Sequence, residues 1–124
     1  LSATLTGDGI VNLANTGVFA VATVNVGVAA SITVSADTGD AVLPVSIALC
    51  ETNPATGMCI NPTMPTLGPV ITSIASDATP SYAFFVTETA SVPFDPANNR
   101  VFVRFKDAGG VTRGATSVAV RTLP

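Results

Sequence analysis

The sequence has 124 residues, of which 48% are hydrophobic and 10% are charged, and its formal net charge is −3. This length suits a single domain covering residues 1–124, and an apolar chain with so small a net charge is not expected to be disordered. The acidic balance also argues against nucleic acid as a partner. Nine Pro, ten Gly and many Val, Ile and Thr residues favour strands over helices along the chain.

No segment has the pattern of a membrane span or of a leader peptide. The most apolar stretch, at residues 17–36, is interrupted by Thr, Asn and Ser residues and alternates with a period of two, so membrane insertion is not expected. The sequence does not begin with Met, and we interpret it as a mature exported protein or a fragment of a longer one.

The first part of the chain carries the weakest pattern. Residues 1–15 are expected to form either an edge strand or the tail of a preceding module. From Val18 to Val26, alternation of apolar residues predicts a strand with Val18, Ala20 and Ala22 on its buried face.

Clearer alternation predicts strands along the rest of the chain. They are expected at residues 31–36, 43–49, 59–60, 70–74, 82–87, 101–106 and 116–120. Between them, a polar loop at residues 51–58 and the three prolines within residues 61–69 predict irregular connections. Seven or eight short strands, spaced about ten residues apart, indicate an antiparallel β-sandwich or barrel.

The best-specified element is a hairpin near the end of the sequence. Val101, Val103 and Phe105 alternate with one Phe and two basic residues, as in a strand with one buried face. Turn-forming residues follow at positions 107–110, and a second alternating run follows at 116–120. We expect this hairpin to be the last strand pair of an antiparallel sandwich.

The two cysteines give a local prediction. Cys50 and Cys59 flank eight residues that have the composition of a loop between antiparallel strands, so we expect them at opposed positions and joined by a disulfide. A zinc site would need more ligands, and the sequence has no His and no third Cys. A redox pair would normally have the spacing C-x-x-C. A disulfide indicates the periplasm or the cell exterior.

Positive charge is confined to the end of the chain. The last 25 residues contain five basic residues and one acidic residue, whereas the first 99 contain seven acidic and no basic ones. Two interpretations follow: a cationic surface for an acidic glycan or an acidic neighbouring module, or long side chains that cover an exposed strand. The candidate binding face consists of Arg100, Phe102, Arg104, Lys106 and Arg113.

The residues needed for common catalytic and cofactor sites are missing. Without His, a Ser-His-Asp arrangement cannot be built, and no Gly-rich loop precedes a predicted helix. A pair of carboxylates remains conceivable for glycoside hydrolysis. The available acids are instead expected to form turns or strand ends: Asp37, Asp40, Asp77, Glu88 and Asp95. We expect no cofactor.

Calcium binding has a weak basis in the sequence. Asp37 with Asp40, or Asp95 with Asn98, would offer oxygen ligands to Ca²⁺. The ion needs six to eight ligands, and neither group has a recognised spacing. Calcium is therefore not expected at either group.

The closing stretch VFVRFKDAGGVTRGATSVAV resembles the last two strands of bacterial immunoglobulin-like modules, which occur as repeats in exported surface proteins. The matching parts are residues 101–103, 107–110 and 116–120, and AASITVSAD at 29–37 is similar to the second strand of such modules. The resemblance implies an all-β, immunoglobulin-like antiparallel sandwich of seven to eight strands. It also implies a non-catalytic structural or adhesive role at the cell surface, with other modules of the same parent chain as partners.

Three alternatives to this role remain open. A carbohydrate-binding module is the first, with Tyr82 as a candidate contact, although the sequence has no Trp. A hydrolase would need two acids in one cleft. The third alternative is a subunit that completes its fold with a neighbour's strand, suggested by the loosely patterned residues 1–15.

Overall fold

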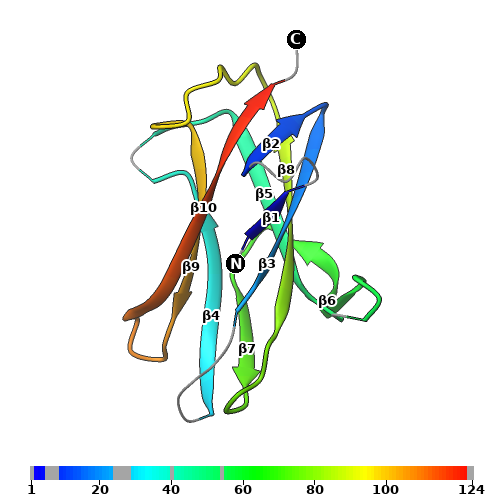
Figure 1. Cartoon of the computed structure of the whole chain (residues 1–124), viewed down its shortest axis with the longest axis vertical. Helices are drawn as coiled ribbons and strands as arrows, with labels where there is room; N and C mark the ends of the chain where they lie inside the picture. The colour runs from blue at the N-terminus through cyan, green and yellow to red at the C-terminus, as the bar shows by residue number, and fades with distance from the viewer. Residues whose placement is uncertain (1, 5–8, 24–28, 40, 54, 123–124) are drawn as a thin grey trace.

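The computed structural model of this chain describes residues 2–4, 9–23, 29–39, 41–53 and 55–122. These residues form strands arranged in two five-stranded sheets (Figure 1). They contain no helix, and hence none long and apolar enough to cross a membrane. The all-β prediction is confirmed, with more strands than the seven or eight expected.

The first sheet has the spatial order β1-β3-β8-β5-β6. Its strands are β1 (Ser2–Thr4), β3 (Thr16–Ala22), β8 (Ser81–Glu88), β5 (Val45–Thr52) and β6 (Cys59–Thr66). The second sheet has the order β2-β10-β9-β4-β7. Its strands are β2 (Ile10–Leu13), β10 (Thr112–Thr122), β9 (Arg100–Lys106), β4 (Ala30–Asp37) and β7 (Val70–Ile74).

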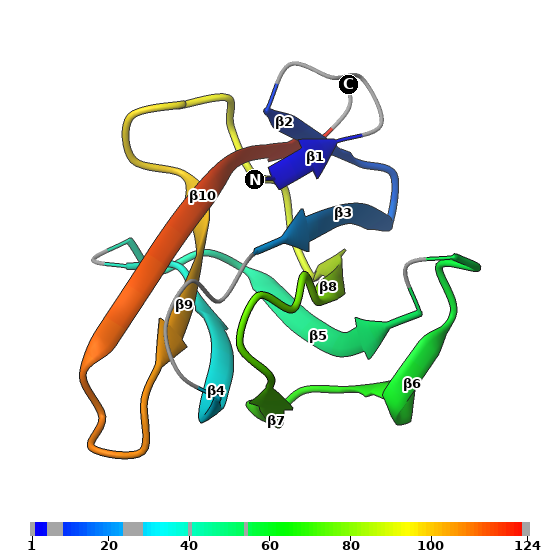
Figure 2. The ribbon, with the colours of Figure 1, turned by 60° about the horizontal axis from the view of Figure 1, so that its bottom comes forward.

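Neighbouring strands pair antiparallel with one exception. β2 runs parallel to β10, with Ile10 opposite Ala119 and Leu13 opposite Thr122. β1 pairs with β3 in the other sheet. The beginning of the chain therefore supplies an edge strand to each sheet, as Figure 2 shows from a second direction.

The core lies between the inner faces of the two sheets. Tyr82 of β8 contacts Phe105 of β9 across the sandwich, with 5.7 Å between the ring centroids. The inner residues of these strands are buried, as their alternation predicted: Tyr82, Phe84, Val86, Val101, Val103 and Phe105. Each such side chain contributes about 1.5–3 kcal/mol by leaving water, and together they hold the sheets against each other.

The predicted inner face of β3 is wrong. Val18, Ala20 and Ala22 lie on its outer face, whereas Phe19 and Val21 are buried. The larger side chain decides the orientation, because Phe19 stacks on Phe84 with 4.9 Å between ring centroids. The predicted continuation of this strand to Val24 and Val26 lies outside the described residues.

The predicted irregular connection at residues 61–69 is also wrong in its first part. Cys59–Thr66 forms β6, although it contains Pro62 and Pro65. Proline has no N–H for a ladder and is tolerated only where one side of the strand has no partner. β6 satisfies this condition because it is the outer strand of its sheet.

Gly17 allows β2 and β3 to approach each other closely. It lies on the inner face of β3, where a Cβ atom would clash with the side chains of Val11 and Leu13. We therefore expect Gly17→Ala to lower the free energy of unfolding by about 1–3 kcal/mol through overpacking. Chemical denaturation followed by circular dichroism measures the change.

Gly68→Ala is the matched control for this variant. A Cβ atom there would meet only the Thr66 hydroxyl, at 3.9 Å. We expect its free energy of unfolding to change by less than about 0.5 kcal/mol. Equal stability of the two variants would contradict the proposed close approach of β2.

Candidate functional site

The structure brings together four of the five residues of the candidate binding face. Arg100, Phe102, Arg104 and Lys106 alternate with the buried residues of β9 and share its outer face, where each is partly buried. Arg113 lies in β10 at the irregularity of the β9–β10 ladder and is largely exposed. The face is therefore one row on β9, with the fifth residue beside the turn.

Arg104 is held by an acid on the neighbouring strand. Its Nε and Nη2 atoms donate to the two carboxylate oxygens of Asp37 at 2.8 and 3.3 Å. The Arg104 guanidinium also lies 5.3 Å from the Phe102 ring centroid. Hydrogen bonding to Arg104 lowers the pKa of Asp37. Burial opposes this effect, and the Gly39 N–H, which donates at 2.8 Å, lowers the pKa further.

Arg100 and Arg113 also donate to groups of their own chain. Arg100 donates from Nε to Ser117 Oγ at 3.1 Å and from Nη1 to the carbonyl of Pro96 at 2.8 Å. Arg113 Nε donates to Asp107 Oδ2 at 2.8 Å. The pKa of Asp107 is lowered chiefly by the Val111 N–H and next by Arg113.

Arg121 makes contacts that the periodicity of the sequence did not indicate. Its Nε donates to Asn12 Oδ1 at 2.7 Å, and its guanidinium lies 5.0 Å from the centroid of the Phe94 ring. Every arginine of the chain thus donates to another part of the fold. On the β9 row, Lys106 is the basic side chain with no hydrogen bond or ion pair to the described residues.

The described acids form no recognisable metal site. Within the described ranges, no three Asp, Glu, His or Cys residues gather in a way that would hold a metal ion. Asp95 accepts from Asn98 Nδ2 at 3.0 Å, and Glu88 accepts from the Asn15 N–H and the Thr122 hydroxyl. Asp40 lies outside the described residues. One surface pocket contains Asp37 and another contains Glu88, and among the described residues neither contains a second carboxylate.

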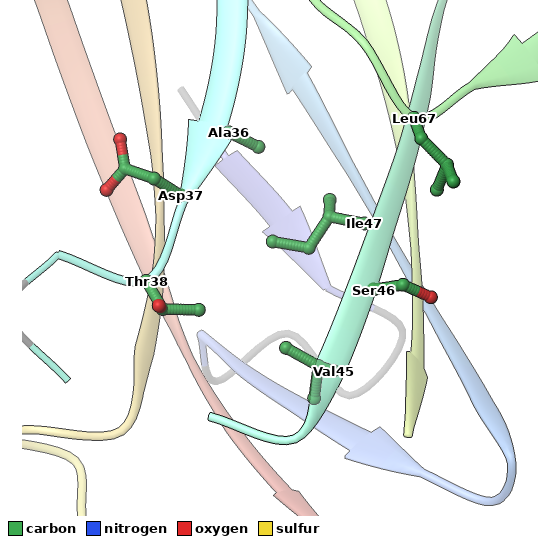
Figure 3. A pocket seen from close by; sticks show the side chains of 7 residues that line it. All are labelled: Ala36, Asp37, Thr38, Val45, Ser46, Ile47 and Leu67. Atoms are coloured by element: carbon green, nitrogen blue, oxygen red, sulfur yellow. The ribbon is translucent and has the colours of Figure 1, made fainter. Parts of the chain in front are cut away.

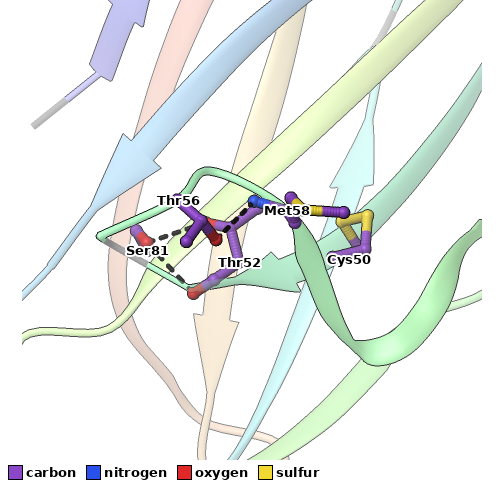
Figure 4. Close-up of a disulfide and its surroundings, with 6 residues drawn as sticks. Cys50, Thr52, Thr56, Met58 and Ser81 are labelled. Carbon is purple, nitrogen blue, oxygen red and sulfur yellow. Dashed lines mark hydrogen bonds between the residues drawn. A yellow bond between two sulfur atoms is a disulfide. The ribbon is translucent and has the colours of Figure 1, made fainter.

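The predicted disulfide joins Cys50 of β5 to Cys59 of β6, with 5.6 Å between the Cα atoms (Figure 4). The expected directly opposed register is wrong, because Cys59 faces Thr52 and the β5–β6 ladder is irregular on either side of Glu51. The loop between them is closed by backbone bonds, in which Asn53 N–H donates to the Met58 carbonyl at 2.9 Å.

The prediction that Glu51 lies in a loop is wrong, because Glu51 is part of β5. Its Oε1 atom accepts from the Thr72 hydroxyl at 2.8 Å and from Asn61 Nδ2 at 3.4 Å. Asn61 Nδ2 also donates to the Ile71 carbonyl at 3.2 Å. Because Thr72 and Ile71 belong to β7, these bonds join the two sheets. Alternation along β5 could have indicated this placement, because Glu51 lies two positions after Leu49 and therefore shares its face of the strand.

Tyr82 is unavailable to a sugar, so the predicted role of this residue in carbohydrate binding is wrong. Its side chain is completely buried, and its hydroxyl makes no hydrogen bond to the residues that the structure describes. Burial, followed by the charge of nearby Glu51, raises the pKa of Tyr82, and the neighbouring Thr72 hydroxyl offsets part of the rise. Its role is to fill the core.

An open groove lies between the end of β4 and the beginning of β5, with a volume of about 380 Å³. Ala36, Val45, Ile47 and Leu67 form its apolar lining. In Figure 3, Ala36 and Ile47 point toward each other across the groove, and the carboxylate of Asp37 points away from them. Asp37, Thr38 and Ser46 also line it, so the surface of the groove is as polar as it is apolar, and among the described residues Asp37 is its one carboxylate.

Comparison with known proteins identifies a similar fold. No family model and no curated sequence matches this chain. The chain is similar in structure to the N-terminal domain of PorA, with a TM-score of 0.52 and 8% sequence identity. The likeness covers 97% of this chain and 87% of that domain. At this identity it shows the fold alone.

Asp37→Asn tests the ion pair with Arg104. Because the folded state lowers the pKa of Asp37 below its ordinary value of 3.8, the carboxylate stabilises the fold above that value and loses its contribution as the pH falls further. Both partners are partly exposed, so we expect a loss of about 0.2–1 kcal/mol at pH 7, which disappears in strong acid. Urea denaturation across pH measures it.

Asp77→Asn is the control, since Asp77 lies in a turn with positive φ that Asn also tolerates. We expect its free energy of unfolding at pH 7 to change by less than about 0.5 kcal/mol. An Asp37→Asn variant as stable as the wild type at pH 7 and low salt would contradict a stabilising pair.

Reduction of the disulfide should destabilise the fold. Closing a loop with a sequence separation of 9 restricts the unfolded chain, and the chain-entropy relation gives about 2.5–3 kcal/mol. Denaturation of the wild type with and without a thiol reductant measures the loss. The Cys50→Ala/Cys59→Ala double variant should not respond to the reductant. An unchanged wild-type stability after verified reduction would refute the expected contribution.

Proposed function

We propose that this chain is a non-catalytic structural or adhesive module with an immunoglobulin-like sandwich, exported to the surface of a bacterial cell. The strand order supports the immunoglobulin-like assignment. In that fold, strands A, B, E and D form one sheet and strands C, F and G form the other. β1, β3, β8 and β5 match the first set, and β4, β9 and β10 match the second, both in space and along the chain.

The additional strands account for the higher strand count. β2 adds to β10, and β6 and β7 are inserted between the strands that correspond to D and E. Seven strands then belong to the common arrangement. The disulfide supports an oxidising compartment, and its position on the outer strand β6 makes it an addition to the common core.

The observation that carries the structural role is the parallel pairing of β2 with β10. These strands lie near the beginning and the end of the chain, and they pair from Ile10–Ala119 to Leu13–Thr122. Tension between the two ends pulls parallel neighbours in opposite directions along their length. The hydrogen bonds between them are then loaded together in shear instead of opening one after another. Such a module would resist extension within a longer surface chain.

Adhesion through the basic face has weaker support. Arg100 and Arg104 are already bound to other parts of the chain. Lys106 makes no hydrogen bond or ion pair with the described residues, although its charge acts on Asp37. An acidic glycan would have to compete with Asp37 for Arg104. Contact with neighbouring modules of the parent chain is therefore the partnership that we favour.

The other functions lack an observation in their favour. The carbohydrate-binding alternative depended on Tyr82, which is buried, and among the described aromatic side chains Phe94 is the largely exposed one. Arg121 already covers one side of the Phe94 ring. The hydrolase alternative requires paired acids, and within the described part of the chain the pockets that contain Asp37 and Glu88 hold one acid each.

Single-molecule extension tests the structural role. With the chain held between marker domains, we expect Val11→Pro to lower the unfolding force strongly, because Pro removes an N–H from β2 at the β2–β10 pair. Val11 is buried, so the variant also loses equilibrium stability. Force and the free energy of unfolding must therefore be measured on the same variants.

Val34→Ala provides the control. Val34 is fully buried but belongs to β4, outside the β2–β10 pair. For an equal loss of equilibrium stability, we expect Val34→Ala to retain a higher unfolding force than Val11→Pro. If force followed equilibrium stability alone in both variants, the proposed mechanical role of the β2–β10 pair would be wrong.

A further inference from the structure

β6 contributes no side chain to the core of the sandwich. All eight of its residues, Cys59–Thr66, are described, and each is either partly buried or exposed. Its larger apolar residues, Ile60 and Met64, are 50% and 75% exposed. In this it differs from β7, the other inserted strand, whose inner residues are buried. Burial of apolar surface, which holds most strands in place, therefore does little to hold β6.

The backbone pairing of β6 is also weak. Over its length it has three register positions with β5, and the ladder is irregular on either side of Glu51. Pro62 and Pro65 have no N–H to donate to it. By contrast, β5 pairs with β8 at eight consecutive positions, and β7 pairs with β4 at five. The strands before and after β6 in the sequence would thus keep their partners if β6 detached.

Beyond the ladder, two links join β6 to the strands around it. The Asn61 amide donates to Glu51 Oε1 at 3.4 Å and to the Ile71 carbonyl at 3.2 Å. Among the described residues, Asn61 supplies the side-chain hydrogen bonds between β6 and other strands. The second link is the Cys50–Cys59 disulfide, at the first residue of β6. Because ordering a strand costs entropy at every residue and the net energy of a hydrogen bond is small, the covalent link is the stronger constraint.

The disulfide occupies a covered position on the outer surface. Cys50 pairs with Ala83, an outward-facing residue of β8, so Cys50 is on the outer face of the first sheet. It is nevertheless completely buried, whereas Cys59 is only partly buried. A side chain on an outer face is buried only where another segment covers it, and β6 is joined to Cys50 at this point (Figure 4). Detachment of β6 would therefore uncover the Cys50 sulfur.

We propose that the Cys50–Cys59 disulfide is a redox-controlled latch, whose reduction releases β6 while the rest of the sandwich stays folded. A dithiol supplies the two electrons and two protons. Its thiolate attacks the partly exposed Cys59 sulfur, the S–S bond breaks, and the Cys50 sulfur leaves and takes up a proton. The second thiol of the reductant then closes a disulfide within the reductant and releases Cys59 as a thiol. In the product, the outer edge of β5 is open from Val45 to Thr52, and an open edge can pair with an added strand.

This inference is independent of the mechanical role proposed for β2 and β10, because β6 lies at the opposite edge of the sandwich. Backbone ¹⁵N relaxation of the intact chain, measured with and without dithiothreitol, tests it. In the oxidised chain we expect order parameters of about 0.85 in β6. After reduction they should fall below about 0.6 in β6 and stay at about 0.85 in β8 and β9. The loss of stability expected on reduction concerns complete unfolding and is a separate measurement.

Two variants separate the covalent link from the hydrogen bonds of Asn61. The Cys50→Ala/Cys59→Ala double variant should have a mobile β6 without reductant and should not respond to it. Asn61→Ala keeps the disulfide, so its oxidised form should retain an ordered β6. Alkylation gives a second readout: without denaturant, iodoacetamide should label the reduced wild type at Cys50 as well as at Cys59.

Each outcome decides the proposal. An ordered β6 after verified reduction overturns it, as does a Cys50 thiol that stays unlabelled. Loss of order in β8 and β9 together with β6 also overturns it, because the disulfide would then hold the whole sandwich. Release of β6 from oxidised Asn61→Ala would show that the disulfide is not the latch. Selective loss of order in β6, with labelling of Cys50, supports the proposal.

Discussion

Packing between the inner faces of β8 and β9 is the constraint on which the other features of this structure depend. Both strands are central in their sheets, and Tyr82 meets Phe105 where the two sheets face each other. Phe19 and Phe84 stack beside this contact within the first sheet. With these side chains in place, the outer residues of β9 necessarily face solvent. The row of Arg100, Phe102, Arg104 and Lys106 is thus a consequence of the core, as is its spacing.

Sequence alternation predicted these central strands because large apolar residues alternate there with polar, small or basic ones. It failed in β3, where apolar residues occupy both faces and alternation alone does not choose between them. There Phe19 and Val21 take the inner face, and Gly17 provides the space that β2 needs. Local alternation gives no information about that space. The prediction for β6 failed for a related reason, because Pro is compatible with a strand only when the strand is known to lie at an edge.

The candidate site was predicted less completely than the fold, because its contacts join residues far apart in the sequence. Arg104 and Asp37 are separated by 67 positions, and Arg121 and Asn12 by 109. Charge placement correctly brought the β9 row together, but it did not show that these arginines bind the acids and carbonyls of their own fold. The clustering of positive charge in the sequence therefore overstates the charge available to a ligand. Four arginines that bridge elements act first as parts of the scaffold.

The two sides of the sandwich are closed in different ways, and the difference follows from the order of strands along the chain. On one side, the beginning of the chain supplies β1 to one sheet and β2 to the other. On the opposite side, closure depends on β6 and β7, which follow β5 and precede β8. The disulfide and the Glu51–Thr72 bond fix this inserted pair at one end of β5. The insertion adds two strands and a covalent link, but β6 pairs with β5 only from Leu49 onward. The other half of β5 is therefore left uncovered, and the groove lies there.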